Sequence, residues 1–208
     1  MFFPLQKTFL SLNKYNFNAY NDVACEIFVD IKDYNNNVVP NQSVDIYLDD
    51  TLLGTIKTDS NGFGTLSYTF SNRNQIGIHS IRANNASVIL RVHFDSSWQP
   101  VTYLNTLYKD YSTTNPVKYR VYNNVVEIRG EATNNSQRNL DSESFASIPS
   151  QYAPTASVRS VQQGSSAYKF GIGLSASGNI GWNRYGTNSN VTSLPANSWL
   201  NVYLIYTI

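Results

Sequence analysis

The feature that most constrains this chain is a two-residue alternation of apolar and polar side chains. Within residues 23–32 the charged side chains all occupy even-numbered positions, and odd positions from 23 to 31 are apolar. The pattern returns in segments 44–48, 66–70, 117–121 and 168–174. Successive side chains of a β-strand point to opposite faces, so this period indicates half-buried strands. Short strands separated by turns rich in Asn, Ser and Gly predict an all-β protein with little helix.

Composition and charge exclude several classes of partner. With 41% hydrophobic and 14% charged residues, the chain can bury a core. Its net charge of +1 argues against nucleic-acid binding through a field of cations. One cysteine (Cys25) and two histidines (His79 and His93) leave little for a disulfide framework or a metal site. We expect no cofactor and no metal. No window reaches the roughly 18 apolar residues of a membrane helix, so we expect no membrane insertion, and residues 1–12 lack the pattern of a signal peptide.

Changes in pattern predict three parts: an N-terminal segment (1–21), a first β-sandwich (22–97) and a second β-sandwich (98–208). The polar stretch Phe94–Pro100 reads as the linker between the two sandwiches.

Two strings in the first half resemble a known family. Val39–Leu48 combines Pro40 with an alternating strand, and Leu53–Gly64 carries a Gly-Thr strand followed by the turn Thr58-Asp59-Ser60-Asn61-Gly62. This order resembles the bacterial immunoglobulin-like repeats of surface adhesins and phage structural proteins. The resemblance implies an immunoglobulin-like β-sandwich that acts as a spacer or docking module and performs no chemistry.

Four segments of the second half resemble another family. They are Val117–Gly130, Ile148–Pro154, Leu174–Ile180 and the closing strand Trp199–Ile208. Their order looks like the C-terminal head domain of phage tail-fibre and baseplate receptor-binding proteins. The resemblance implies a jelly-roll-like β-sandwich, a homotrimer, and attachment of a virion to a carbohydrate or protein receptor on the host envelope.

The last strand gives independent reason to expect an oligomer. Val202, Leu204 and Tyr206 lie on one face of Trp199–Ile208, and Tyr203 and Ile205 lie on the other. A strand that is apolar on both faces needs cover on both sides. We therefore expect other copies of the chain to supply cover that one domain lacks.

The segment Gly181–Asn190 is the strongest candidate site. It presents Trp182, Asn183, Arg184 and Tyr185, and sugar recognition uses aromatic platforms beside planar hydrogen-bonding groups. The alternative is that Trp182 fills the core and the rest is a solvated loop. Residues 137–139 form a second candidate.

A formal dinucleotide-binding match in the second half lacks the required context. Gly171, Gly173 and Ala176 fit its spacing, but the flanking residues alternate with the period of a strand. These glycines read instead as small residues on one face of a strand, where a neighbouring backbone can approach closely.

Together these observations predict a non-enzymatic viral tail component. We expect a trimeric head that binds a host cell-surface glycan or protein, in contact with other virion tail proteins. One alternative is a cell-surface adhesin or structural surface protein, which would be extracellular. Another is a carbohydrate-binding module of a glycoside hydrolase, which a cleft with two opposed carboxylates would favour.

Overall fold

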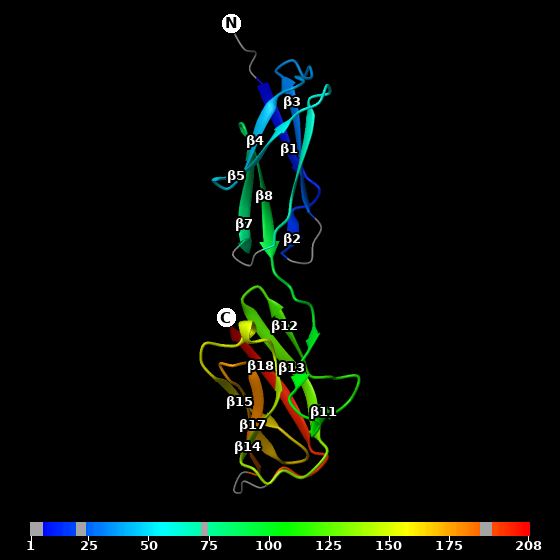
Figure 1. Cartoon of the computed structure of the whole chain (residues 1–208), viewed down its shortest axis with the longest axis vertical. Helices are drawn as coiled ribbons and strands as arrows, with labels where there is room; N and C mark the ends of the chain where they lie inside the picture. The colour runs from blue at the N-terminus through cyan, green and yellow to red at the C-terminus, as the bar shows by residue number, and fades with distance from the viewer. Residues whose placement is uncertain (1–5, 20–23, 72–74, 188–192) are drawn as a thin grey trace. The chain divides into compact units, whose positions relative to one another are not determined.

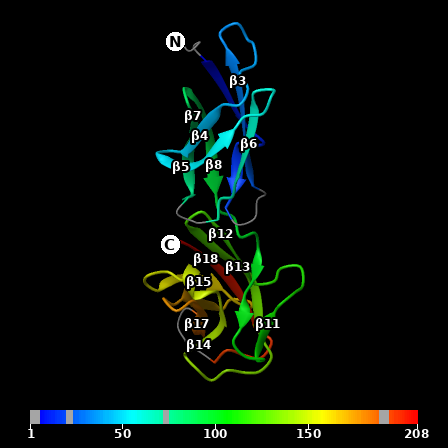
Figure 2. The same ribbon diagram turned by 45° about the horizontal axis from the view of Figure 1, so that its top comes forward.

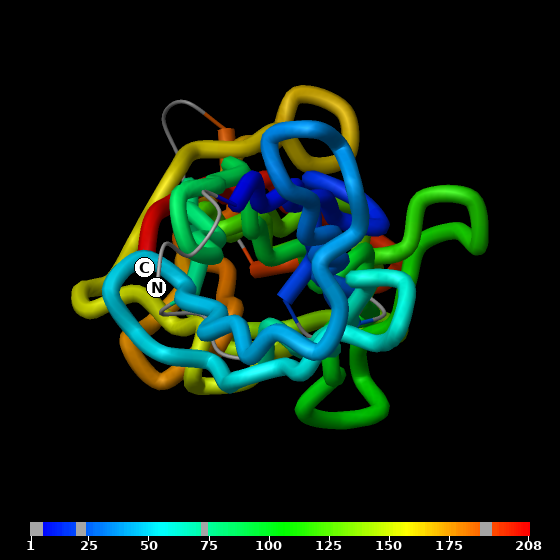
Figure 3. The backbone as a smooth tube through the Cα atoms, turned by 90° about the horizontal axis from the view of Figure 1, so that it is seen from above, coloured from blue at the N-terminus to red at the C-terminus, as the bar shows by residue number. Residues whose placement is uncertain are grey.

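The computed structural model describes residues 6–19, 24–71, 75–187 and 193–208. The chain divides into two compact units, Met1–Asp95 and Ser96–Ile208. Both are built mainly from antiparallel strand pairs, and the first unit also has one parallel pair; the described residues contain no α-helix, and a 3₁₀ turn lies at Ser150–Tyr152 (Figure 1). The backbone tube likewise shows no helical coil along the described chain (Figure 3). The prediction of an all-β protein is confirmed.

The first sheet of the first unit contains three antiparallel strands. They are β1 (Gln6–Leu12), β3 (Cys25–Asp33) and β6 (Phe63–Tyr68), in the order β1-β3-β6. Cys25, Ile27, Val29 and Ile31 of β3 are all buried. The alternation that predicted this strand therefore also identifies its buried face.

The second sheet of this unit contains five strands in the order β2-β8-β7-β4-β5. Their bounds are β2 (Asn16–Asn18), β4 (Ser43–Leu48), β5 (Thr51–Lys57), β7 (Gly77–Ala83) and β8 (Ala86–His93). Strand β2 pairs with β8 in parallel, whereas the other neighbours are antiparallel. The segment 1–21, which the sequence separated from the sandwich, thus supplies one strand to each sheet.

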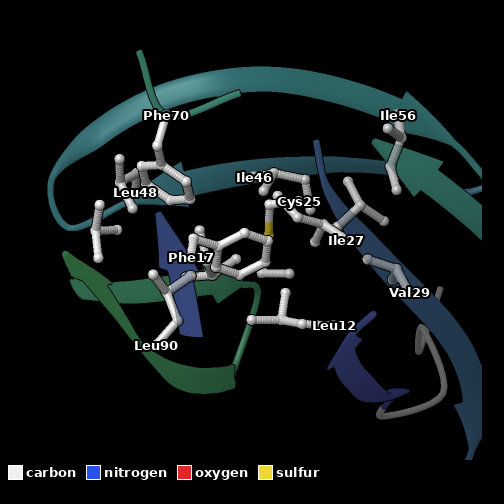
Figure 4. Close-up of a cluster of buried hydrophobic side chains, with 14 of the residues drawn as sticks. Leu12, Phe17, Cys25, Ile27, Val29, Ile46, Leu48, Ile56, Phe70 and Leu90 are labelled. Carbon is white, nitrogen blue, oxygen red and sulfur yellow. The ribbon is translucent and has the colours of Figure 1, made fainter. Parts of the chain in front are cut away.

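Side chains from both sheets form one hydrophobic core. Phe17 from β2, Ile27 from β3 and Ile46 from β4 meet around the buried thiol of Cys25 (Figure 4). Burial of apolar surface between two layers is the main stabilisation of such a unit.

The predicted turn after β5 forms as its residues require. The Asp59 carboxylate accepts the backbone N–H groups of Asn61 at 2.7 Å and Phe63 at 3.0 Å. Gly62 has φ +71°, and a Cβ there would lie 2.8 Å from the carbonyl oxygen of Ile31. Both the conformation and the close approach therefore favour glycine at this position.

In the second unit, β13 (Val125–Asn134) is the centre of the first sheet. On one side it pairs with β18 (Trp199–Thr207) (Figures 1 and 2). On the other side, the first half of β13 pairs with β12 (Lys118–Tyr122) and its last residues pair with β11 (Tyr108–Asp110). Strand β9 (Gln99–Pro100) pairs with β12. Asn123, with φ 52°, begins the two-residue turn of the β12–β13 hairpin. That hairpin was predicted from the sequence and is confirmed.

The second sheet of this unit runs in the order β10-β14-β17-β16-β15. The strands are β10 (Thr102–Tyr103), β14 (Ser142–Ser147), β15 (Val158–Gln163), β16 (Lys169–Leu174) and β17 (Asn179–Gly186). Ile128 and Val202 of one sheet, and Ile172 and Trp182 of the other, are almost fully buried. The arrangement is consistent with a second β-sandwich.

Candidate functional site

Strand β17 carries the residues that the sequence nominated, and a bulge decides where they point. Ile180 and Trp182 face the core, while Asn179, Gly181 and Asn183 alternate with them. Arg184 then adopts φ 51°, and the register with β16 shifts at this point. An extra residue in one strand turns the following side chain to the opposite face. Tyr185 consequently points inward like Trp182.

The two aromatic side chains of the candidate segment are core residues. Trp182 is 1% exposed and Tyr185 is 0% exposed. The Tyr185 ring stacks on Tyr168 with centroids 5.0 Å apart, and its hydroxyl accepts the backbone N–H of Ser165 at 3.1 Å. The alternative in which Trp182 fills the core is therefore what the structure shows, and the predicted ligand contact has no exposed ring to support it.

A chain of hydrogen bonds anchors Trp182 between the sheets. Its indole N–H donates to the Tyr108 hydroxyl at 2.8 Å, and this hydroxyl donates to Glu143 at 2.6 Å. Arg138 binds both carboxylate oxygens of Glu143, each at 2.8 Å. Such bidentate, charge-assisted pairs are among the stronger hydrogen bonds in proteins.

The ionisation of this network follows from its contacts. Burial raises the pKa of Glu143, but the bonds from Arg138 and Tyr108 outweigh burial and leave the pKa below its usual value. Burial and the bond to Glu143 raise the pKa of Tyr108. The carboxylate is therefore charged and the phenol neutral over the ordinary pH range. Arg138 belongs to the second candidate segment (137–139), and its guanidinium is bound to the Glu143 carboxylate.

The opposite face of the same sheet carries a polar groove of about 320 Å³. Its lining comes from strands β14, β17, β16 and β15, and from Ser157 and Ser175, which directly precede β15 and follow β16. One row of residues crosses all four strands in the order Ser144, Gly181, Gly173 and Arg159. Two glycines thus lie at the middle of the row, where other residues would place side chains.

Two amides lie along β17 on either side of Gly181. Asn179 and Asn183 each lie two residues from this glycine on the same face, about 13 Å apart at the usual rise per residue. A Cβ on Gly171 would collide with the Asn183 amide, and a Cβ on Gly173 would lie 3.4 Å from Cγ of Arg159. These glycines therefore let long polar side chains lie along the sheet.

The polar groups of the groove are available to a ligand. Among the described residues, none contacts the side chains of Ser142, Ser144, Arg159, Asn179 or Asn183 by a hydrogen bond or an ion pair. Neutral hydroxyls, planar amides and one guanidinium make a surface suited to a ligand rich in hydroxyl groups.

The structure places the nominated residues differently from one another. Asn183 lines the groove, whereas Arg184 is exposed but is not part of its lining. Trp182 is also among the lining residues, although its side chain is buried in the core. Residues 188–190 of the candidate segment lie outside the described residues. The sequence signal for the groove was the set of glycines on β16, which had been interpreted only as small residues on a strand face.

Two other features are absent from the described residues: a metal-binding cluster and a membrane-spanning helix. The described ranges contain no cluster of three His, Cys, Asp or Glu side chains that could hold a metal ion. Within them, no helix has the length and apolar character needed to cross a membrane.

Comparisons with protein-family models, with curated proteins and with solved structures find no match to this chain. The two resemblances drawn from sequence motifs therefore stay predictions.

Proposed function

We propose that this protein is a non-enzymatic component of a viral tail and that its second unit binds a carbohydrate on the surface of the host cell. In this proposal the first unit is an immunoglobulin-like spacer or dock, and the second is a jelly-roll-like head. The observation that carries the proposal is the open polar groove, in which the side chains of Ser142, Ser144, Arg159, Asn179 and Asn183 have no hydrogen-bond or ion-pair partner among the described residues.

The charge of the groove supports binding rather than cleavage of a glycan. Cleavage of a glycosidic bond ordinarily uses two carboxyl groups on opposite sides of that bond. Among the described lining residues, Glu143 is the only carboxyl group, and Arg138 holds both of its oxygens.

The last strand supports assembly of the head into a trimer. Its inner residues Leu200, Val202 and Leu204 are buried within one chain. On its outer face, Tyr203 remains 47% exposed and Ile205 53% exposed. Further copies of the chain would cover these side chains. Three sites on one assembly would raise the apparent affinity for a repetitive surface polymer.

Binding of fluorescently labelled full-length protein to intact bacteria tests the proposal. We expect saturable binding to at least one species in a panel of Gram-positive and Gram-negative cells, and inhibition by the purified surface polysaccharide of that species. Binding to no species, or binding that the polysaccharide leaves unchanged, would contradict the proposal.

A further inference from the structure

We propose that the groove on the β14–β17–β16–β15 sheet selects an anionic glycan, with Arg159 as the residue that determines this selectivity. The inference rests on the proposed function, since it names the ligand class of the same site. It adds that each chain carries a complete site.

The charge balance of the groove favours an anion. Of the described lining residues, only Arg159 and Glu143 are charged. The Glu143 carboxylate is neutralised by Arg138, whereas Arg159 has no partner among the described residues. A guanidinium presents a planar fork of donors that matches a carboxylate or a phosphate. A ligand that places either group beside Arg159 therefore gains a contact that a neutral glycan cannot make.

The position of Arg159 fixes where the anionic group must lie. Arg159 ends the row that begins at Ser144 and passes through Gly181 and Gly173. Its Cγ lies 3.4 Å from the position that a Cβ on Gly173 would take, so the Arg159 side chain begins beside this glycine in the groove. A sugar ring above Gly181 would meet hydroxyls from β14 on one side and the guanidinium on the other. The amides of Asn179 and Asn183 would bind hydroxyl groups of the neighbouring residues of the glycan chain.

The pairing of the strands argues against an extended peptide. A peptide that adds to a sheet pairs with the free edge of an outer strand. Strands β17 and β16 at the centre of the groove each have a hydrogen-bonded neighbour on both sides, so their backbone groups are already paired. A peptide that paired with the outer strand β15 would extend the sheet sideways and would not lie on the face that carries the groove. The groove therefore offers side chains to a ligand lying on its face. One unpaired cation among the described lining residues is also too little to bind a nucleic-acid backbone.

Every described lining residue belongs to one chain and lies in one sheet or directly beside one of its strands. The intrinsic affinity of the site should consequently be independent of assembly, and a trimer would multiply sites without completing them.

Calorimetric titration of the full-length protein tests the inference with four probes of similar length. They are an oligogalacturonate, a glycerol-phosphate oligomer, an uncharged malto-oligosaccharide and an oligoglutamate peptide. We expect at least one of the two anionic polyols to bind more tightly than the neutral oligosaccharide. Their comparison distinguishes carboxylate from phosphate as the recognised group.

Two variants assign the effect to the groove. Arg159→Gln keeps a long polar side chain but removes the charge, and should weaken anion binding about tenfold or more. It should leave binding of the neutral oligosaccharide unchanged. Lys109→Gln removes one charge from β11 in the other sheet and should leave both affinities unchanged.

Several results would overturn the inference. Equal affinity of Arg159→Gln and the unmodified chain for anionic oligomers would do so, as would equal affinity for charged and neutral oligosaccharides. Oligoglutamate binding that matches the glycans and needs Arg159 would assign the groove to acidic peptides. If the chain binds cells while none of the oligomers binds, the ligand class is wrong and the proposed function stands. If anionic oligomers bind through Arg159 but no cell is bound, the proposed function fails alone.

Discussion

Replacing Tyr108 with phenylalanine removes one oxygen atom that joins two buried groups. The Tyr108 hydroxyl accepts the indole N–H of Trp182 at 2.8 Å and donates to Glu143 at 2.6 Å. The ring itself packs against Phe145 with centroids 5.3 Å apart, and phenylalanine preserves that packing. The variant therefore isolates the two hydrogen bonds from the hydrophobic contribution of the ring.

The expected loss can be worked from the two bonds. An unsatisfied buried donor costs about 1–3 kcal/mol, and a hydrogen bond to a charged group contributes about 1.5–3 kcal/mol. Because Glu143 keeps its two hydrogen bonds from Arg138, losing the bond from Tyr108 should cost less than the full contribution of a hydrogen bond to a charged group. We expect the free energy of unfolding of the second unit to fall by about 2–4 kcal/mol. For a unit of this size, the midpoint temperature should fall by roughly 8–16 °C.

The chain contains separate probes for its two units. Trp98, Trp182 and Trp199 all belong to the second unit, so tryptophan fluorescence during urea unfolding reports on that unit. Cys25 is the only cysteine, and it is buried in the core of the first unit. Burial raises the pKa of its thiol to about 11, so fast reaction with a thiol reagent reports opening of the first unit.

The matched control is Tyr111→Phe, which removes a phenol hydroxyl from a side chain that is 52% exposed. It should change the stability by less than about 0.5 kcal/mol. Tyr108→Phe should leave the reactivity of Cys25 unchanged. If Tyr108→Phe also lowers the stability of the second unit by less than about 0.5 kcal/mol, the network does not stabilise the fold as argued.

Three further predictions follow from the same structure. Trp182→Ala should lower the stability of the second unit by about 3–5 kcal/mol in urea unfolding, because it leaves a cavity in the core. An unchanged urea midpoint would contradict the placement of Trp182 in the core and would favour its role as a ligand contact. The lowered pKa of Glu143 means that its contribution to stability is complete above the unfolded-state pKa of about 4.3 and is lost as the pH falls through the folded-state value. The fluorescence midpoint should fall with acidification below about pH 5, and Glu143→Gln should flatten that fall; an unchanged slope would contradict the assignment. Light scattering should give a mass of about 70 kDa, three times the 23.4 kDa of one chain, and Ile205→Glu should lower it; a monomer for the unmodified chain would refute the trimer.

The alternation of side chains was sufficient to predict most of the strands. Residues 25–31 alternate in the sequence and in burial, and the hairpin around Asn123 was identified from its turn residues. Period-two patterns predict strands because burial on one face imposes them directly. Strands β1 and β2 were missed because they lie in a segment with short, broken apolar pieces, whose pairing depends on the rest of the sandwich.

The candidate site was harder to predict, because its position depends on a bulge and on sheet order. Alternation alone would place Trp182 and Tyr185 on opposite faces, yet the left-handed conformation of Arg184 returns both to the core. The groove gathers residues from four strands, whose neighbour relations are not written in any local pattern. Of the residues nominated from the sequence, Asn183 and Trp182 line the groove, and the ring of Trp182 is buried in the core.

The most direct test of the account is to map the bound glycan by NMR on the full-length chain. Purified surface polysaccharide fragments from a bacterium that the protein binds would be titrated while backbone amide shifts are followed. The account predicts shifts concentrated at the residues that line the groove, which are 142–144, 157–159, 173–175, 179 and 181–183. Shifts concentrated on the β12–β13–β18 sheet, or in the first unit, would show that the receptor binds elsewhere and would contradict the account.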